Sequence, residues 1–254
     1  MAEPSAATVT AAIVVIGNEI LSGRTRDANM HFLAGRLSDL AIRLKEVRVV
    51  SDDTAAIVAA VNEVRARYDY VFTSGGIGPT HDDITADAIA AAFGVGIDVD
   101  PRARDVMERY YPPGQLNAAR LRMARIPFGA SLIDNPVSAA PGFRIGNVFV
   151  MAGVPAIFQA MVESVRHELV GGAKLLARAL ASALPEGQIA EPLRAIQEQY
   201  PDIEIGSHPT YRAGVPTTTI VLRGTDLATL RAATLAVAAM MRAQGVEPEE
   251  TIAT

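Results

Sequence analysis

Cysteine is absent from this 254-residue chain, and so is any long run of basic or of apolar residues. Without cysteine the protein has no disulfide, no thiolate nucleophile and no cysteine-ligated zinc site. The net charge of −5 and the lack of a basic run indicate no non-specific binding to nucleic acids or anionic membranes. No apolar run reaches the roughly 18 to 20 residues that a membrane span needs. The first ten residues, MAEPSAATVT, lack the features of a signal peptide, so we expect a cytoplasmic protein.

Half of the residues are apolar, which is enough for a sizeable core. Along the first two thirds of the chain, short apolar runs alternate with segments whose apolar residues recur at helical spacing. The runs expected to form buried strands are 11–17, 42–50, 69–75 and 147–155; the segments expected to form helices are 27–40, 51–68, 82–94 and 156–169. This alternation predicts βαβ units and a mostly parallel sheet with helices on both faces.

Two glycines at 171 and 172 mark the best candidate for a domain boundary. They predict a first domain at 1–170 and a small α+β domain at 171–254. Within the second domain we expect strands near 202–207 and 217–224 and helices near 189–199 and 227–242. The run LLARALASAL at 175–184 fits neither periodicity.

The stretch TSGGIGPTHDDIT, residues 73–85, joins a predicted strand to a predicted helix. In an open α/β sheet, ligands bind at the carboxyl ends of the strands, where such a loop lies. Gly75, Gly76 and Gly78 let the backbone approach a ligand closely, and their N–H groups can cradle a phosphate. The loop is neither a Walker loop nor a Rossmann fingerprint, because it lacks both spacings.

Two adjacent carboxylates are unexpected beside a phosphate loop. Asp82 and Asp83 would repel a phosphate unless a divalent cation bridges them to it, or one of them acts as an acid or base. The alternative is that both cap the helix that starts near Ile84. Asp52 follows the second strand on the same edge of the sheet and either caps the next helix or contacts the ligand. Glu19 follows the first strand there and forms either a plain turn or a wall of the pocket.

Other polar residues near this edge leave alternatives open. His81 interrupts the glycine-rich stretch and either contacts the ligand or faces solvent. Arg24, Arg26 and Arg144 either supply positive charge to a phosphate or are solvated. The proline-containing segment at 135–143 is either a structural bend or a wall that sets specificity. No nucleophile elbow of the form G-x-S-x-G is present.

Four motifs taken together resemble the molybdenum-cofactor-biosynthesis (MogA/MoeA-type) domain, in the variant found in CinA proteins. They are GNEILSGRTRDAN at 17–29, SDD at 51–53, TSGGIGPTHDDIT at 73–85 and NPVSAAPGF at 135–143. The third is more specific to CinA proteins and to the related domain of eukaryotic FAD synthases than to MogA. Further on, YPDIEIGSHPTYR and VLRGTD resemble the KH-like region that follows in CinA proteins. Ser138, where glycine is usual, and His208 depart from the family pattern.

The resemblance implies a three-layer α/β/α, molybdopterin-binding-like domain with a mostly parallel sheet, followed by a small α+β, KH-like domain. It implies a nucleotide or pterin phosphate as ligand and divalent-metal-dependent hydrolysis (Mg, Mn or Co) of nucleotide pyrophosphates resembling ADP-ribose or FAD. Adenylyl transfer to molybdopterin is the first alternative, and a nucleotide- or pterin-binding regulatory module without turnover is the second. The amidohydrolase domain of full-length CinA is not expected here. The KH-like domain lacks a G-x-x-G clamp and a basic stripe, so we expect it to mediate packing or homo-oligomerisation and not nucleic-acid binding.

Carried over by position, the resemblance assigns catalysis and metal binding to Asp52, Asp82 and Asp83. It assigns phosphate or substrate binding to positions on the first loop and on the glycine-rich loop: Glu19, Asn29, Ser74, Gly75, Gly76, Gly78, Pro79, Thr80 and Thr85.

Overall fold

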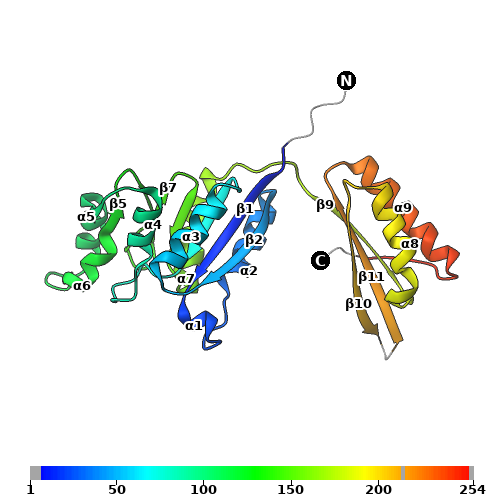
Figure 1. Ribbon diagram of the computed structural model, residues 1–254, viewed down its shortest axis with the longest axis horizontal. Helices are drawn as coiled ribbons and strands as arrows, with labels where there is room; N and C mark the ends of the chain where they lie inside the picture. Colours follow the sequence, from blue (N-terminus) through cyan, green and yellow to red (C-terminus); the bar gives the residue numbers. More distant parts are fainter. Residues whose placement is uncertain (1–6, 213–214, 252–254) are drawn as a thin grey trace, which may run out of the picture. The chain divides into compact units, whose positions relative to one another are not determined.

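The computed structural model describes residues 7–212 and 215–251 and divides the chain into two compact units, Met1–Gly172 and Ala173–Thr254 (Figure 1). Each unit has its own hydrophobic core. The sequence had placed the division after residue 170.

The first unit is built on a six-stranded, mostly parallel sheet with the strand order β2-β1-β3-β8-β7-β6. The parallel strands are β1 (Val9–Ile16), β2 (Ile42–Val50), β3 (Tyr70–Ser74) and β8 (Val148–Met151). β7 (Gly142–Ile145) and β6 (Ser131–Ile133) extend the sheet in antiparallel fashion. A separate antiparallel pair joins β4 (Ile97–Val99) to β5 (Arg125–Pro127). The prediction of a mostly parallel sheet is confirmed.

Helices cover both faces of this sheet, as Figure 1 shows. Along β1, Ala12, Val14 and Ile16 face one core, which α3 (Thr54–Arg65) and α4 (Thr85–Phe93) complete. The alternate residues of β1 face a second core, completed by α2 (Asn29–Asp39) and α7 (Pro155–Val165). A strand buried on both faces explains why the run at 11–17 is apolar throughout and does not alternate with polar residues. The predicted three-layer α/β/α architecture is confirmed.

Short helical segments complete the first unit. They are α1 (Asn18–Leu21), α5 (Pro101–Tyr110), α6 (Ala118–Leu121), and the 3₁₀ turns η1 (Arg122–Ala124) and η2 (Arg166–Glu168). Asp100 caps α5 by accepting hydrogen bonds from the N–H groups of Arg102 and Ala103, and Pro101 occupies the first turn.

The capping alternatives that the sequence left open are not found at either helix. Asp53, and not Asp52, caps α3, because its carboxylate accepts a hydrogen bond from Ala56 N at 2.9 Å. α4 begins after Ile84 without any side-chain cap, so neither aspartate of the preceding loop caps it. The helix ends as predicted, at Gly94 in the left-handed conformation with φ of 65°. The aspartates of the glycine-rich loop therefore need another explanation.

The second unit is a four-stranded antiparallel sheet in the order β10-β11-β9-β12, with two helices against it. Its elements are β9 (Leu176–Ser182), α8 (Glu186–Gln199), β10 (Glu204–Arg212), β11 (Val215–Gly224), α9 (Leu227–Ala243) and β12 (Glu249–Thr251). The run that fitted neither periodicity is β9, which pairs with both β11 and β12. The small α+β domain is confirmed. Within the described ranges, no helix has the length and apolar character to cross a membrane.

Candidate functional site

The loops that follow the parallel strands meet at one edge of the sheet. Gly17 follows β1 and donates its N–H to Val50 O at the end of β2, at 3.1 Å. Gly75 follows β3 and donates its N–H to Met151 O at the end of β8, also at 3.1 Å. The ends of four strands are thereby tied together where a parallel sheet binds its ligands.

The glycine loop, residues 75–84, needs its first two glycines for steric reasons. Gly75 has φ of 110° and Gly76 has φ of 69°, which are strained for residues with a side chain. A Cβ atom at Gly75 would collide with Ile16 O, and one at Gly76 would collide with Thr85 Oγ1. The loop is therefore packed directly against the backbone of β1 and the start of α4.

Three of the residues assigned to ligand binding are buried and fix the glycine loop from behind. Asn29 donates through Nδ2 to Ser74 Oγ and to Gly153 O, both at 2.8 Å. Thr85 donates through Oγ1 to Gly75 O at 2.9 Å. Asn29 and Thr85 are almost fully buried, as is Ser74. The hydrogen bonds of Asn29 and Thr85 therefore hold the glycine loop in position.

The backbone N–H groups of the glycine loop are the main donors at this edge. Those of Gly76, Ile77 and Gly78 donate no hydrogen bond to any acceptor within residues 7–212 and 215–251. Free consecutive N–H groups next to a helix N-terminus form a cradle for an anion. The glycine loop thus presents unused donors, as the sequence led us to expect.

A cleft of about 480 Å³ lies over these donors. The predicted residues that line it are Glu19, Gly75, Gly76, Gly78, Pro79 and Asp83. Its walls include Met123, Asn135 and Ser138, so the proline-containing segment at 135–143 forms part of the cleft. Asn135 holds that wall in shape by donating to Ser138 Oγ at 2.7 Å and to Ala140 O at 2.8 Å. Asp52, Asp82, Thr80 and Thr85 do not line the cleft.

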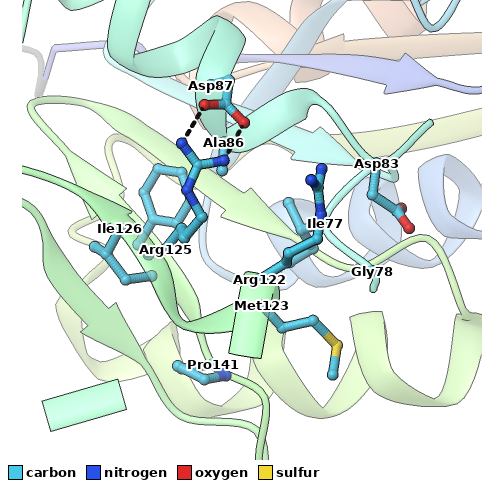
Figure 2. Close-up of a pocket in the computed structure, with 12 residues that line it drawn as sticks. Ile77, Gly78, Asp83, Ala86, Asp87, Arg122, Met123, Arg125, Ile126 and Pro141 are labelled. Carbon is cyan, nitrogen blue, oxygen red and sulfur yellow. Dashed lines mark hydrogen bonds and ion pairs between the residues drawn. The ribbon is translucent and has the colours of Figure 1, made fainter. Parts of the chain in front are cut away.

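A smaller pocket of about 20 Å³ adjoins the cleft at the glycine loop and shares Gly76, Ile77, Gly78, Asp83 and Met123 with it (Figure 2). Arg125 forms a two-pronged ion pair with Asp87 there, with both N–O distances at 2.7 Å. Arg122 lines the same pocket beside the glycine loop but has no hydrogen-bond or ion-pair partner among the described residues. Its positive charge is therefore available to a ligand.

Arg122 is the cation that sequence reasoning missed, because it lies in an irregular proline-rich region and belongs to no motif. Of the three arginines considered from the sequence, Arg144 pairs with Glu168 at 2.8 Å and lies over the Phe149 ring. Arg26 lines a small pocket beside the cleft.

The three carboxylates assigned to metal binding have different surroundings. Asp83 accepts hydrogen bonds from the N–H group, at 2.8 Å, and from the hydroxyl of Thr80. Asp52 accepts one from Asn18 N at 2.8 Å. The Asp82 side chain is 65% exposed, and the nearby Thr80 hydroxyl and its own backbone N–H lower its pKa, so it is ionised at neutral pH. The neighbouring His81 side chain is 98% exposed and lies outside the lining of the cleft.

No cluster of three or more acidic or histidine side chains that could hold a metal ion occurs in the described part of the chain. Magnesium, however, needs only one or two carboxylates when substrate phosphates supply the other ligands. One carboxylate and one amide oxygen are available as such ligands. The Glu19 carboxylate lines the cleft without a partner among the described residues, and the buried Asn29 Oδ1 accepts no hydrogen bond. An unsatisfied buried acceptor costs about 1–3 kcal/mol, which a bound cation or donor would recover.

Comparison with known proteins supports this reading of the fold. Residues 12–171 match the family described as "Probable molybdopterin binding domain". The crystal structure of the protein CinA with unknown function from Thermoplasma acidophilum superposes with a TM-score of 0.60 at 32% identity, covering 64% of this chain and 99% of that chain. The likeness thus covers nearly all of that chain.

Two curated relatives are longer than this chain. A CinA-like protein from Citrifermentans bemidjiense is 41% identical over 167 residues, which is 63% of this chain and 40% of the relative. A probable FAD synthase from Caenorhabditis elegans is 33% identical over 226 residues, which is 79% of this chain and 44% of the relative. The chain therefore spans less than half the length of either relative.

The expectation of a KH-like second domain is wrong. Residues 174–250 match the family described as "FAD synthase, middle domain". The two motifs behind the expectation, at 200–212 and 221–226, lie mostly on β10 and at the end of β11, and such strand segments do not specify one fold. The chain belongs to the molybdopterin-binding-domain family, in its CinA-type branch, with a second unit of the FAD synthase middle-domain type.

Proposed function

We propose that this protein hydrolyses the phosphoanhydride bond of an adenosine-containing diphosphate, such as ADP-ribose or FAD, with the help of a divalent cation. The observation that carries the proposal is the set of three free N–H groups, at Gly76, Ile77 and Gly78, at the base of the cleft. They are arranged to bind the oxygens of a phosphate group, and the cleft volume of about 480 Å³ is in the range of nucleotide-sized ligands.

The charges around the glycine loop favour a diphosphate over a single phosphate. The cleft and the smaller pocket are both lined by the backbone segment Gly76 to Gly78. One phosphate would bind these N–H groups, and the next would stay in the cleft, within reach of the exposed side chain of Arg122 beside the glycine loop. Donors that are already in place when negative charge develops on the phosphate oxygens lower the barrier to hydrolysis.

A bound divalent cation would neutralise charge on the attacked phosphate and favour deprotonation of water. Two of the protein's carboxylates line the cleft: Glu19 would hold the cation, and Asp83 would accept the proton of the water. Hydrolysis adds one water across the P–O–P bridge, so that ADP-ribose yields AMP and ribose 5-phosphate and FAD yields AMP and FMN.

The relatives favour the same ligand class. One relative is described as a probable FAD synthase, and the second unit matches a domain described as part of FAD synthase. FAD and ADP-ribose share the adenosine diphosphate group that the glycine loop and Arg122 are placed to bind. Adenylyl transfer would use the same phosphate-binding groups with a different acceptor in place of water.

The test is to incubate the full chain with ADP-ribose or FAD, or with ATP plus molybdopterin, each with Mg²⁺, Mn²⁺ or Co²⁺, and to measure AMP by chromatography. We expect metal-dependent AMP release from ADP-ribose or FAD. His81→Ala is the control variant for a change on the glycine loop outside the cleft. Because this exposed side chain does not line the cleft, its loss should leave the rate of AMP release unchanged. Adenylylated pterin without hydrolysis would replace the proposal with adenylyl transfer. Tight binding without any product would replace it with a regulatory module.

A further inference from the structure

A small pocket of about 50 Å³ adjoins the cleft beneath the loop that follows β1. It shares Glu19, Thr25, Gly153 and Pro155 with the cleft, so a ligand in one is next to a ligand in the other. The volume is enough for an ion with a water molecule but not for a sugar or a base.

Asn29 lines this pocket and carries an unused acceptor. The residue is 3% exposed, and its Nδ2 donates to Ser74 Oγ and Gly153 O. Because a backbone carbonyl only accepts hydrogen bonds, the contact with Gly153 O fixes the orientation of the amide. Oδ1 therefore lies on the opposite side of the amide, and no donor in the described part of the chain reaches it.

Glu19 contributes a carboxylate that is also without a partner. It lines both the pocket and the cleft and makes no hydrogen bond or ion pair among the described residues. Its oxygens fold back over the end of β1, within 2.6 and 2.7 Å of where a Cβ atom on Gly17 would lie. The glycine therefore leaves room for this position of the carboxylate.

The other polar groups of the pocket narrow the class of ligand. Asp27 accepts hydrogen bonds from Asn29 N at 3.3 Å and Met30 N at 3.1 Å and adds a second negative charge. Arg26 is the one positive side chain in the lining and is exposed. A pocket with two carboxylates, one free amide oxygen and one exposed cation suits a hard cation, for which oxygen ligands are preferred.

We propose that this pocket is a divalent-cation site, in which Glu19 and Asn29 Oδ1 are the protein ligands and the cation faces the cleft. This cation site rests on the proposed function in one respect: the substrate phosphate would supply the remaining ligands of the cation. It explains why a carboxylate borders a phosphate cleft, since a cation between them removes the repulsion. It places the cation on the loop after β1, and not at the three aspartates assigned from the sequence. Asp52 and Asp83 already accept hydrogen bonds from neighbouring groups. Asp82 lies outside the lining of the cleft.

The test is to titrate the full chain with Mn²⁺ alone and to follow the electron paramagnetic resonance signal of the free ion. We expect saturable binding of one ion per chain, weakened about tenfold or more in Glu19→Gln. Asp82→Asn tests the rival assignment, since it removes a carboxylate that the resemblance assigns to the metal; if Glu19 is the ligand, the affinity of this variant should stay within about twofold. Thermal unfolding of each variant checks that the fold is unchanged.

Asn29→Ala tests the second ligand and should also weaken Mn²⁺ binding. This variant loses the bonds to Ser74 and Gly153 and is open to misfolding, in which case Glu19→Gln alone decides the outcome. Binding that survives in Glu19→Gln but is lost in Asp82→Asn or Asp83→Asn would overturn the proposal, and so would the absence of Mn²⁺ binding. The titration measures ion binding without a nucleotide, and the test of the proposed function measures AMP release. The cation site and the proposed function can therefore fail independently of each other.

Discussion

The parallel strands of the first unit have two ends with different chemistry. At their amino ends, Asp69 accepts hydrogen bonds from Thr10 N at 2.7 Å and Thr10 Oγ1 at 2.8 Å. Asn147 donates there to Arg65 O at 3.0 Å and to Tyr68 O at 2.9 Å. These polar side chains join neighbouring segments of the protein to each other.

At the carboxyl ends of the same strands, polar groups are left without partners among the described residues. They are the N–H groups of Gly76, Ile77 and Gly78, the Oδ1 atom of Asn29 and the side chains of Glu19 and Arg122. A buried polar atom such as Asn29 Oδ1 is usually satisfied within a protein, so its lack of a partner points to a ligand. The other groups of this set are half-buried or exposed beside it and are open to the same ligand. The difference separates residues that stabilise the fold from residues that are available to a ligand.

Gly75→Ala should have the largest effect, because it damages fold and function at the carboxyl ends together. Its φ of 110° is strained for alanine, and the added methyl group would collide with Ile16 O. We expect a loss of about 3 kcal/mol in the free energy of unfolding and loss of hydrolysis. Urea unfolding and AMP release measure the two effects.

Gly35→Ala is the matched control for that substitution. Gly35 lies in α2, and a Cβ atom there would meet no atom within 4 Å. We expect unchanged hydrolysis and a gain of up to about 1 kcal/mol in the free energy of unfolding, because alanine favours a helix. Equal behaviour of the two variants would show that the glycine loop is not sterically restricted.

Arg122→Gln should affect function without affecting the fold. Its guanidinium lines the pocket beside the glycine loop and makes no ion pair among the described residues, so its loss breaks no bond within the protein. We expect KM for ADP-ribose to rise about tenfold, corresponding to one charge-assisted contact, with kcat little changed. Steady-state kinetics at low and high salt test this, because the difference should shrink as salt screens the charge.

Arg109→Gln is the control for that change of charge. Arg109 lies on α5, has no partner among the described residues, and is absent from the lining of the cleft and the smaller pocket. Its removal should leave KM unchanged. If both variants raise KM equally, the effect belongs to net charge and not to the pocket.

Asp69→Asn should have the smallest effect and should act on stability alone. Hydrogen bonds from Thr10 lower the pKa of Asp69, so this carboxylate stabilises the fold above the ordinary aspartate pKa of about 3.9. We expect a loss of about 1 kcal/mol at pH 7, since the side chain is exposed. The difference from wild type should disappear as pH falls through the lowered pKa. Urea unfolding at several pH values checks this, and a change in AMP release would contradict the separation of the two strand ends.

Much of the fold could be predicted because its signals are local. The strand at 11–17 is apolar on both faces, and Gly94 ends α4 as its position after the helix predicts. The strand β9 could not be predicted, because its alanine-rich run becomes a strand only by pairing with β11 and β12, which are distant in sequence.

The candidate site was predictable only in part. The glycine loop was found because its glycines, proline and aspartates stand together in the sequence. Which aspartate caps α3 could not be told, because both stand just before the helix in the sequence. Arg122 could not be found either, since its position beside the glycine loop depends on the packing of an irregular segment. The assignment of Asp52, Asp82 and Asp83 as metal ligands stays a prediction, and the Mn²⁺ titration decides between it and the proposed site at Glu19 and Asn29.

The close approach of Gly153 to Gly75 has a consequence for redesigning this protein. A Cβ atom on Gly153 would lie 3.1 Å from the α-carbon of Gly75, so the base of the cleft is made where two main chains touch. There is no side chain at that contact to exchange for a larger or smaller one. A protein engineer who wants a different ligand preference must therefore work on the walls, at Met123, Ser138 and Ile157, and leave the base as it is.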